Sequence, residues 1–158
     1  MSNPLSRTNS SLYVKGDNGD FVLLTNFTDS TITTVKAYSF YRATSLVYLG
    51  LENVTNIYAY AFYNCSNLDT IKLPHVKTIA ARAFYGCSKL STAELGGPGN
   101  PVTSIGQYAF SSAPTGSQIY VWTEGGKSLS NRPWGAPANS IVLLDSNNPN
   151  AKEEYEQQ

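Results

Sequence analysis

Few side chains in this sequence are of the types that perform acid–base or nucleophilic chemistry. The single histidine, His75, follows a proline and has no nucleophile and carboxylate at the spacing of a triad. The stretch GGPGNP at 96–101 lacks the Lys-Ser/Thr pair of a phosphate-binding loop. Glu153, Glu154 and Glu156 are typical of a solvated charge run. The sequence therefore predicts no catalytic or cofactor-binding site, and we expect a protein that is not an enzyme.

The composition narrows the classes of partner. The 158 residues include 11 Lys and Arg and 11 Asp and Glu, so the net charge is zero, which argues against a nucleic-acid or anionic-membrane partner. No apolar run reaches the length of a bilayer span. Eleven tyrosines, 12 glycines and only 14% charged residues favour a β-rich extracellular or virion protein. The segment MSNPLSRTNSSLY at 1–13 has no apolar signal region, which favours assembly inside a host cell.

An internal repeat dominates the middle of the chain. Phe40, Phe62 and Phe84 are spaced 22 residues apart, and Phe110 follows after the GGPGNP insertion. Copies at 32–51, 54–73, 76–95 and 102–121 predict a solenoid, in which stacked units bury a shared core. The other apolar columns are Ile32, Val54, Val76 and Val102; Val35, Ile57, Ile79 and Ile105; Leu46, Leu68 and Leu90; Leu49, Ile71, Ala93 and Ile119; and Leu51, Leu73, Leu95 and Val121.

Each repeat predicts its own local structure. The alternating TIKLP at 70–74 indicates a strand, and equivalent strands of neighbouring units should form a parallel sheet. VTNI at 54–57 indicates a second short extended piece on the opposite side, and AYAFYNC at 59–65 a turn or one helical turn. The phenylalanines should stack as core wedges.

The two cysteines occupy one column of the repeat. Cys65 and Cys87 alternate there with Ala43 and Ala113, so small buried thiols are expected. A disulfide stays geometrically open, because adjacent strands lie about 5 Å apart. Two cysteines and one distant histidine are too few ligands for a metal site.

The units are similar to the BspA-like, or Treponema-type, leucine-rich repeat, V-T-x-I-x-x-x-A-F-x-x-C-x-x-L-x-x-I-x-L-P. Residues 54–74 match this pattern fully, and residues 76–95 nearly so. The resemblance implies a right-handed solenoid with a parallel sheet on one face, and a binding or structural role rather than catalysis. Residues 119–145, with PWGA at 133–136, are similar to the closing segment of phage-borne members.

The expected fold class is a β-rich α/β solenoid with capped ends. Residues 1–29 are expected to form an N-terminal arm and a β-hairpin cap, since alternating runs at 11–24 flank the turn signal GDNG. Residues 30–122 form four repeats, and residues 123–145 a C-terminal cap with a last strand at 140–144. Trp122 and Trp134 are expected to close the end of the core. Residues 146–158 read as a flexible polar tail.

Function is therefore expected on the outer faces. We expect a non-enzymatic virion component of a bacteriophage, in a tail fibre, tail tip or head decoration, with a bacterial cell-surface adhesin as the alternative. Its partners would be other virion proteins, a second copy of itself, or a host-surface glycan or protein. Two columns on the turn side are rich in tyrosine, and they either bind a partner or shield the flank of the solenoid, although one could face the core. The first column is Tyr41, Tyr63 and Tyr85, and the second is Tyr38, Tyr60, Arg82 and Tyr108. The candidate interaction residues are Tyr41, Tyr48, Tyr60, Tyr63, Thr70, Lys72, Tyr85, Thr92, Glu94 and Tyr120.

Overall fold

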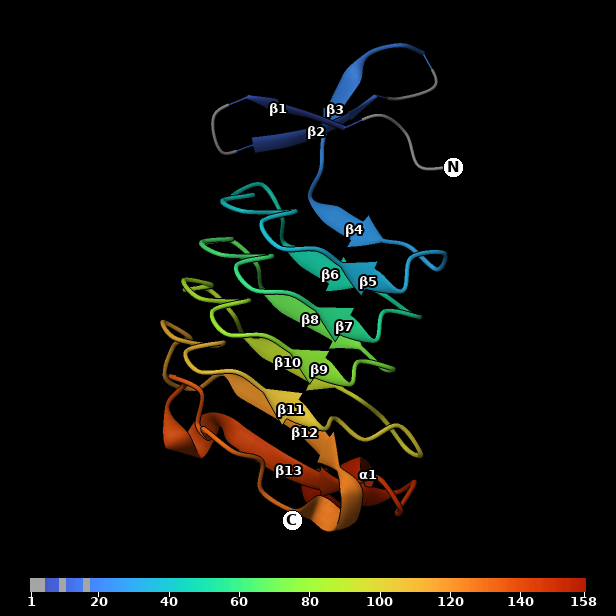
Figure 1. The fold of residues 1–158 in the computed structure, drawn as a ribbon, viewed down its shortest axis with the longest axis vertical. Helices are drawn as coiled ribbons and strands as arrows, with labels where there is room; N and C mark the ends of the chain where they lie inside the picture. The colour runs from blue at the N-terminus through green and yellow to red at the C-terminus, as the bar shows by residue number, and fades with distance from the viewer. Residues whose placement is uncertain (1–4, 9–10, 16–17) are drawn as a thin grey trace.

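The computed structural model describes residues 5–8, 11–15 and 18–158. From residue 24 onward the chain winds into successive coils that stack along the long axis (Figure 1). Every coil contributes one strand to a main sheet, and the first four coils also contribute a two-residue strand to a second sheet. This arrangement confirms the predicted solenoid with a parallel sheet, whereas the right-handed path stays a prediction.

The main sheet is parallel and contains six strands in the order β13-β12-β10-β8-β6-β4. Its register follows the repeat, because Leu49 pairs with Ile71 and Ile71 with Ala93. Strands β4 and β13 extend the sheet beyond the four predicted copies at either end. The strands are β4 (Asn26–Thr28), β6 (Tyr48–Gly50), β8 (Thr70–Leu73), β10 (Thr92–Leu95), β12 (Gln118–Thr123) and β13 (Ile141–Asp145).

A second, smaller sheet is formed by the short strands that follow β4, β6, β8 and β10 along the chain (Figure 1). Its four parallel strands run in the order β11-β9-β7-β5 and confirm the predicted short extended pieces. They are β5 (Thr34–Val35), β7 (Asn56–Ile57), β9 (Thr78–Ile79) and β11 (Ser104–Ile105).

A ladder of phenylalanine rings runs through the core. The ring centroids of Phe40 and Phe62 lie 5.1 Å apart, as do those of Phe62 and Phe84, and Phe110 follows at 5.3 Å. The rings are nearly parallel, and the last three are fully buried. Phe27 of β4 starts the ladder at 4.8 Å from Phe40. The repeated phenylalanine is therefore a core residue, as predicted.

The turns that carry these rings are joined by backbone hydrogen bonds from coil to coil. The amide of Phe40 donates to the carbonyl of Ala61 at 2.8 Å, and the amide of Phe62 donates to Ala83 at 2.8 Å. At the last repeat, the amide of Phe110 donates to Trp134 at 2.9 Å. These bonds satisfy backbone groups that would otherwise be costly to bury.

Both cysteines are buried and neither forms a disulfide, so the open question of a disulfide is answered for this structure. The Cys65 thiol donates to the carbonyl of Phe40 at 3.2 Å, and the Cys87 thiol to that of Phe62 at 3.6 Å. Burial raises the pKa of the Cys87 thiol well above its ordinary value, with a further contribution from Cys65. The protonated thiol is thus both a small apolar filler and a weak hydrogen-bond donor between coils.

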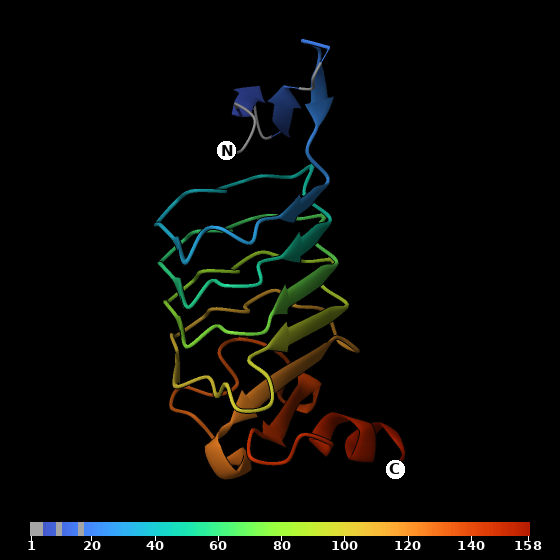
Figure 2. The same cartoon turned by 90° about the vertical axis from the view of Figure 1, so that its right-hand side faces the viewer.

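At the N-terminal end, β1 (Leu5–Thr8), β2 (Ser11–Lys15) and β3 (Phe21–Leu23) form a separate antiparallel sheet. The pairing of β2 with β3 confirms the predicted hairpin, although its tip at 16–17 lies outside the described residues. This sheet lies beyond β4 and leaves Val22 and Leu23 exposed (Figures 1 and 2). Its capping role stays a prediction.

The C-terminal end contains the largest differences from expectation. Trp134 is buried in the core, as predicted, and its indole N–H donates to the carbonyl of Ser130 at 2.8 Å. Trp122 does not close the core, because strand alternation directs Val121 inward and Trp122 to the opposite face, beside Val142 and Leu144. The last strand forms as predicted, with two 3-10 turns before it, η1 (Glu124–Gly126) and η2 (Ala138–Ser140).

Residues 146–158 are not an unstructured tail in this structure. They form a turn and the helix α1 (Ala151–Glu156), which lies beside β13 at the outer side of the main sheet (Figures 1 and 2). The side chain of Lys152 pairs with Glu94 of β10, with 3.3 Å between Nζ and Oε1. The segment is mostly polar, and its one signal for docking is the pair Ala151 and Tyr155, which are four residues apart and so share a helix face. The prediction of a flexible tail overlooked this pair.

The phenylalanine ladder can be tested by truncation. Phe62→Ala should lower the free energy of unfolding by roughly 3–5 kcal/mol, because it removes a fully buried ring and leaves a cavity. Chemical denaturation measures this change, and Tyr58→Ala, at a half-exposed ring in the same coil, is the matched control. A loss for Phe62→Ala as small as that of the control would contradict the stacked core.

Candidate interaction surfaces

The outer face of the main sheet presents two predicted ladders of side chains. Tyr48, Thr70 and Thr92 are aligned across β6, β8 and β10, and the second ladder places Lys72 beside Glu94. Strand alternation produces this arrangement, since the residues between them point into the core. The structure therefore brings these predicted surface residues together on one face.

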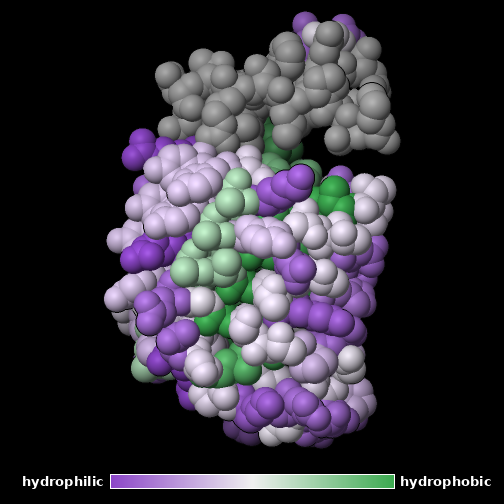
Figure 3. All heavy atoms as spheres, viewed as in Figure 1, coloured by the Kyte–Doolittle hydropathy of each residue, from purple (hydrophilic) through white to green (hydrophobic). Residues whose placement is uncertain are grey.

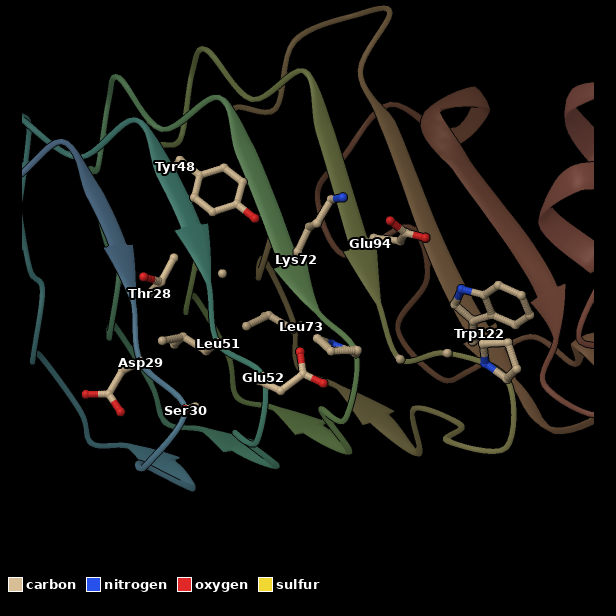
Figure 4. Close-up of a pocket in the computed structure, with 15 residues that line it drawn as sticks. Thr28, Asp29, Ser30, Tyr48, Leu51, Glu52, Lys72, Leu73, Glu94 and Trp122 are labelled. Carbon is tan, nitrogen blue, oxygen red and sulfur yellow. The ribbon is translucent and has the colours of Figure 1, made fainter.

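A groove of about 560 Å³ crosses this face at the carboxyl ends of the strands, and we call it the sheet groove. Figure 4 shows Tyr48, Lys72 and Glu94 projecting from the strands along one side, with Asp29 and Glu52 on the loops along the other. The Trp122 indole marks the far end. The apolar residues that line it are Pro74, Pro98 and Trp122, together with Leu51 and Leu73, whose side chains are fully buried.

Carboxylates dominate the charge of the sheet groove. Asp29, Glu52 and Glu94 line it together with one cation, Lys72. Hydrogen bonds from the Thr31 hydroxyl and amide, both at 2.7 Å, lower the pKa of Asp29 and keep it ionised. Glu94 is already paired with Lys152, so Asp29 and Glu52 are the carboxylates left to meet a ligand.

Of the residues that line this groove, sequence reasoning proposed only Tyr48, Lys72 and Glu94. It missed the column one or two positions past the end of most strands, where Ser30, Glu52, Pro74, Gly96 and Trp122 are equivalent by register. In β12 this position is still within the strand, and Asp29 lies one residue before this column. The indole N–H of Trp122 is buried and has no hydrogen-bond acceptor among the described residues.

The single histidine has a structural role beside the groove. Its Nδ1 lies 2.7 Å from the backbone carbonyl of Glu52 in the preceding coil and 4.0 Å from the Glu52 carboxylate. His75 therefore joins two adjacent turns, as expected for a histidine without catalytic partners.

Tyr120, a predicted interaction residue, is covered in the structure. Its ring is only 3% exposed, because the Lys152 ammonium lies 4.9 Å from its centroid and the Tyr155 ring meets it edge-on at 6.1 Å. Burial is the main cause of its raised pKa, with Glu156 adding to the shift and Lys152 opposing it. The expectation that Tyr120 is available to a partner is wrong here, because α1 occupies that position.

A second surface lies on the turn side, and we call it the turn face. It comprises the segments 36–42, 58–64, 80–86 and 106–112. Tyr41, Tyr63 and Tyr85 stack at 5.2 and 4.9 Å, and Tyr38 stacks on Tyr60 at 5.1 Å. All five rings are exposed or half-buried, so neither tyrosine column faces the core. A hollow of about 390 Å³ opens among Tyr60, Tyr63, Arg82, Tyr85, Tyr108 and Ser111.

The rest of the surface carries little that points to chemistry. Figure 3 shows one narrow apolar stripe along the stack, bordered by polar side chains. Within residues 5–8, 11–15 and 18–158, no group of three or more His, Cys, Asp or Glu side chains could hold a metal ion. In the same residues, no helix has the length and apolar character needed to cross a membrane.

The docking of α1 over Tyr120 predicts opposite changes in the pKa of Tyr120 for two different variants. Ending the chain at Asn148 should lower the pKa of Tyr120, because it removes the burial that chiefly raises it. Lys152→Ala should raise that pKa further, because it deletes the nearby positive charge. NMR titration of ring-labelled tyrosine measures both. An unchanged pKa after the truncation would contradict the docking of α1.

Comparison with known proteins agrees with the repeat geometry. The family described as the BspA type leucine rich repeat region matches residues 23–127 in six copies. The match begins before β4 and ends after β12, so it includes more copies than the four predicted. No curated relative and no solved structure matches the chain. With two parallel sheets, a phenylalanine ladder and a family match over most of its length, the chain belongs to the BspA-type leucine-rich repeat family.

Proposed function

We propose that this protein is a non-enzymatic interaction module that binds a protein or cell-surface ligand in the sheet groove. The observation that carries the proposal is the groove itself, which has an apolar floor and a polar rim along several coils. Binding sites commonly combine a concave apolar surface with a few well-placed polar groups. Leucine-rich repeats of this family typically serve in binding and structural roles rather than in catalysis.

The groove is suited to an elongated ligand with a cationic or hydroxyl-rich surface. Asp29 and Glu52 offer acceptors on one rim, whereas Lys72 offers a donor on the other. The Tyr48 ring lies over Gly50, where an added Cβ would approach the ring to 2.8 Å, so the glycine allows the ring to lie flat on the strand. A ligand would thus meet a rigid surface and lose little binding energy to ordering it.

The finer proposal is a component of a bacteriophage particle. It rests on the resemblance of residues 119–145 to the closing segment of phage-borne repeats, a segment that forms β12, the Trp134 turn and β13. Other virion proteins, a second copy of the chain, or a glycan or protein of the host surface are the proposed partners. A repeat module of a bacterial cell-surface adhesin is the alternative.

The groove can be tested with intact bacterial cells as the probe. We expect labelled protein to bind cells saturably, and Glu52→Lys with Tyr48→Ala to weaken this binding by about tenfold or more, because a carboxylate acceptor and a ring contact are lost. Glu124→Lys makes the same charge change at an exposed site outside the groove and should leave binding unchanged. Equal binding by the double variant would contradict the groove as the site.

The place where the protein is found distinguishes the virion proposal from the adhesin alternative. If the protein is a virion component, mass spectrometry of purified particles should detect it, and immunogold labelling should place it at the tail or the head. Labelling of the envelope of uninfected cells, with none on particles, would overturn the virion proposal in favour of the adhesin alternative.

A further inference from the structure

We propose that the turn face holds a second binding site, centred on Arg82, for an anionic saccharide chain. The site deepens the proposed surface-binding function and depends on it, but its residues are separate from those of the sheet groove. It lies in the hollow of about 390 Å³ among Tyr60, Tyr63, Tyr85 and Tyr108, where the aromatic column is interrupted by the arginine.

Arg82 is the first reason for this assignment. Its Cζ lies 4.9 Å from the centroid of the Tyr108 ring, so the guanidinium is held against an aromatic face. Among the described residues, the Arg82 side chain forms no ion pair and no hydrogen bond. A half-buried guanidinium that is stacked but unpaired keeps its N–H edge for an acceptor from outside, and its fork geometry matches a carboxylate.

The charge of the surrounding surface is the second reason. The four segments of the turn face contain Lys36, Arg42 and Arg82 but no Asp or Glu. The sheet groove has the opposite balance, with three carboxylates and one lysine. A protein of zero net charge therefore separates its charges between two faces. The turn face offers donors and positive charge, and its complement is a ligand with many acceptors and negative charge.

The third reason is that the backbone conformation does not favour large side chains in the column that contains Arg82. Tyr38, Tyr60, Arg82 and Tyr108 have φ of 62°, 60°, 58° and 59°, the left-handed region in which glycine and asparagine are the favoured residues. None of the four is in the core. The turn geometry does not call for three tyrosines and an arginine there, and such side chains are enriched at binding surfaces.

The spacing along the turn face favours a saccharide over an acidic peptide. Stacked tyrosine rings of neighbouring coils are 4.9–5.2 Å apart, so equivalent positions of a column repeat at steps of about this length. An extended peptide places side chains on one face about every 6.6 Å and falls out of register within a few coils. A sugar ring has about the length of one coil step, and its hydroxyl groups can accept from and donate to the phenol groups of successive coils.

The test compares one ligand with and without its charge. We use the tetramer of α-1,4-linked galacturonate, its fully methyl-esterified form and a tetraglutamate peptide, with binding measured by titration calorimetry. The galacturonate tetramer should bind, and its affinity should fall at high salt. The esterified tetramer should bind at least about tenfold more weakly, because the charged hydrogen bonds are lost. Equal binding of the ester, or no binding of the galacturonate tetramer, would overturn the proposal. Binding of tetraglutamate as tight as that of the saccharide would assign the site to acidic peptides instead and would equally overturn it.

The decisive variant is Arg82→Tyr, which restores the tyrosine found at the other three positions of the column and so should leave the fold intact. It should weaken binding of the galacturonate tetramer by about tenfold. Lys72→Glu, in the sheet groove, should leave this binding unchanged, so failure of the groove and failure of the turn-face site give different results. Unchanged affinity in Arg82→Tyr, with the circular dichroism spectrum of the parent, would refute the role of Arg82.

Discussion

The structure depends on the stacking of one coil directly upon the next in an unchanged register. Phenylalanine rings about one strand spacing apart fill the core, and backbone amides of each turn donate to carbonyls of the following turn. Because a coil alone could bury neither its apolar side chains nor its backbone polar groups, each is stable only between neighbours. Any residue that disturbs the register would disturb both sets of contacts together.

The same stacking determines what the outside of the molecule looks like. Residues at equivalent positions form straight columns with the spacing of the coils. A different residue type in one coil therefore alters a single position of a column on the surface. Arg82 within a tyrosine column and Lys72 beside Glu94 are examples. The core is nearly the same in every coil, and specificity is therefore expressed in the outward columns.

The two ends of the stack are treated differently. At the C-terminal end, Trp134 continues the buried turns, β13 adds a strand, and α1 covers Tyr120 through Lys152 and Tyr155. At the N-terminal end, a small antiparallel sheet stands beyond β4 and leaves Val22 and Leu23 exposed. The outer face of the main sheet is thus open toward β4 and closed toward β13, which limits where the sheet groove can receive a ligand.

The sequence by itself determined the repeat, the position of both sheets, the buried phenylalanine column and the small-residue column of Cys65 and Cys87. These features are periodic, and a period of contacts along the stack appears directly as a period in the chain. Only the tertiary structure decided that the two thiols form no disulfide, that Trp122 faces outward, that both tyrosine columns lie outside the core, and that α1 covers Tyr120. The cover on Tyr120 depends on contacts that occur once, such as Lys152 with Glu94, and a periodic pattern contains no signal for them. The other outcomes depend on the path of the backbone between the strands, because a period shows which residues are equivalent but not which way their side chains point.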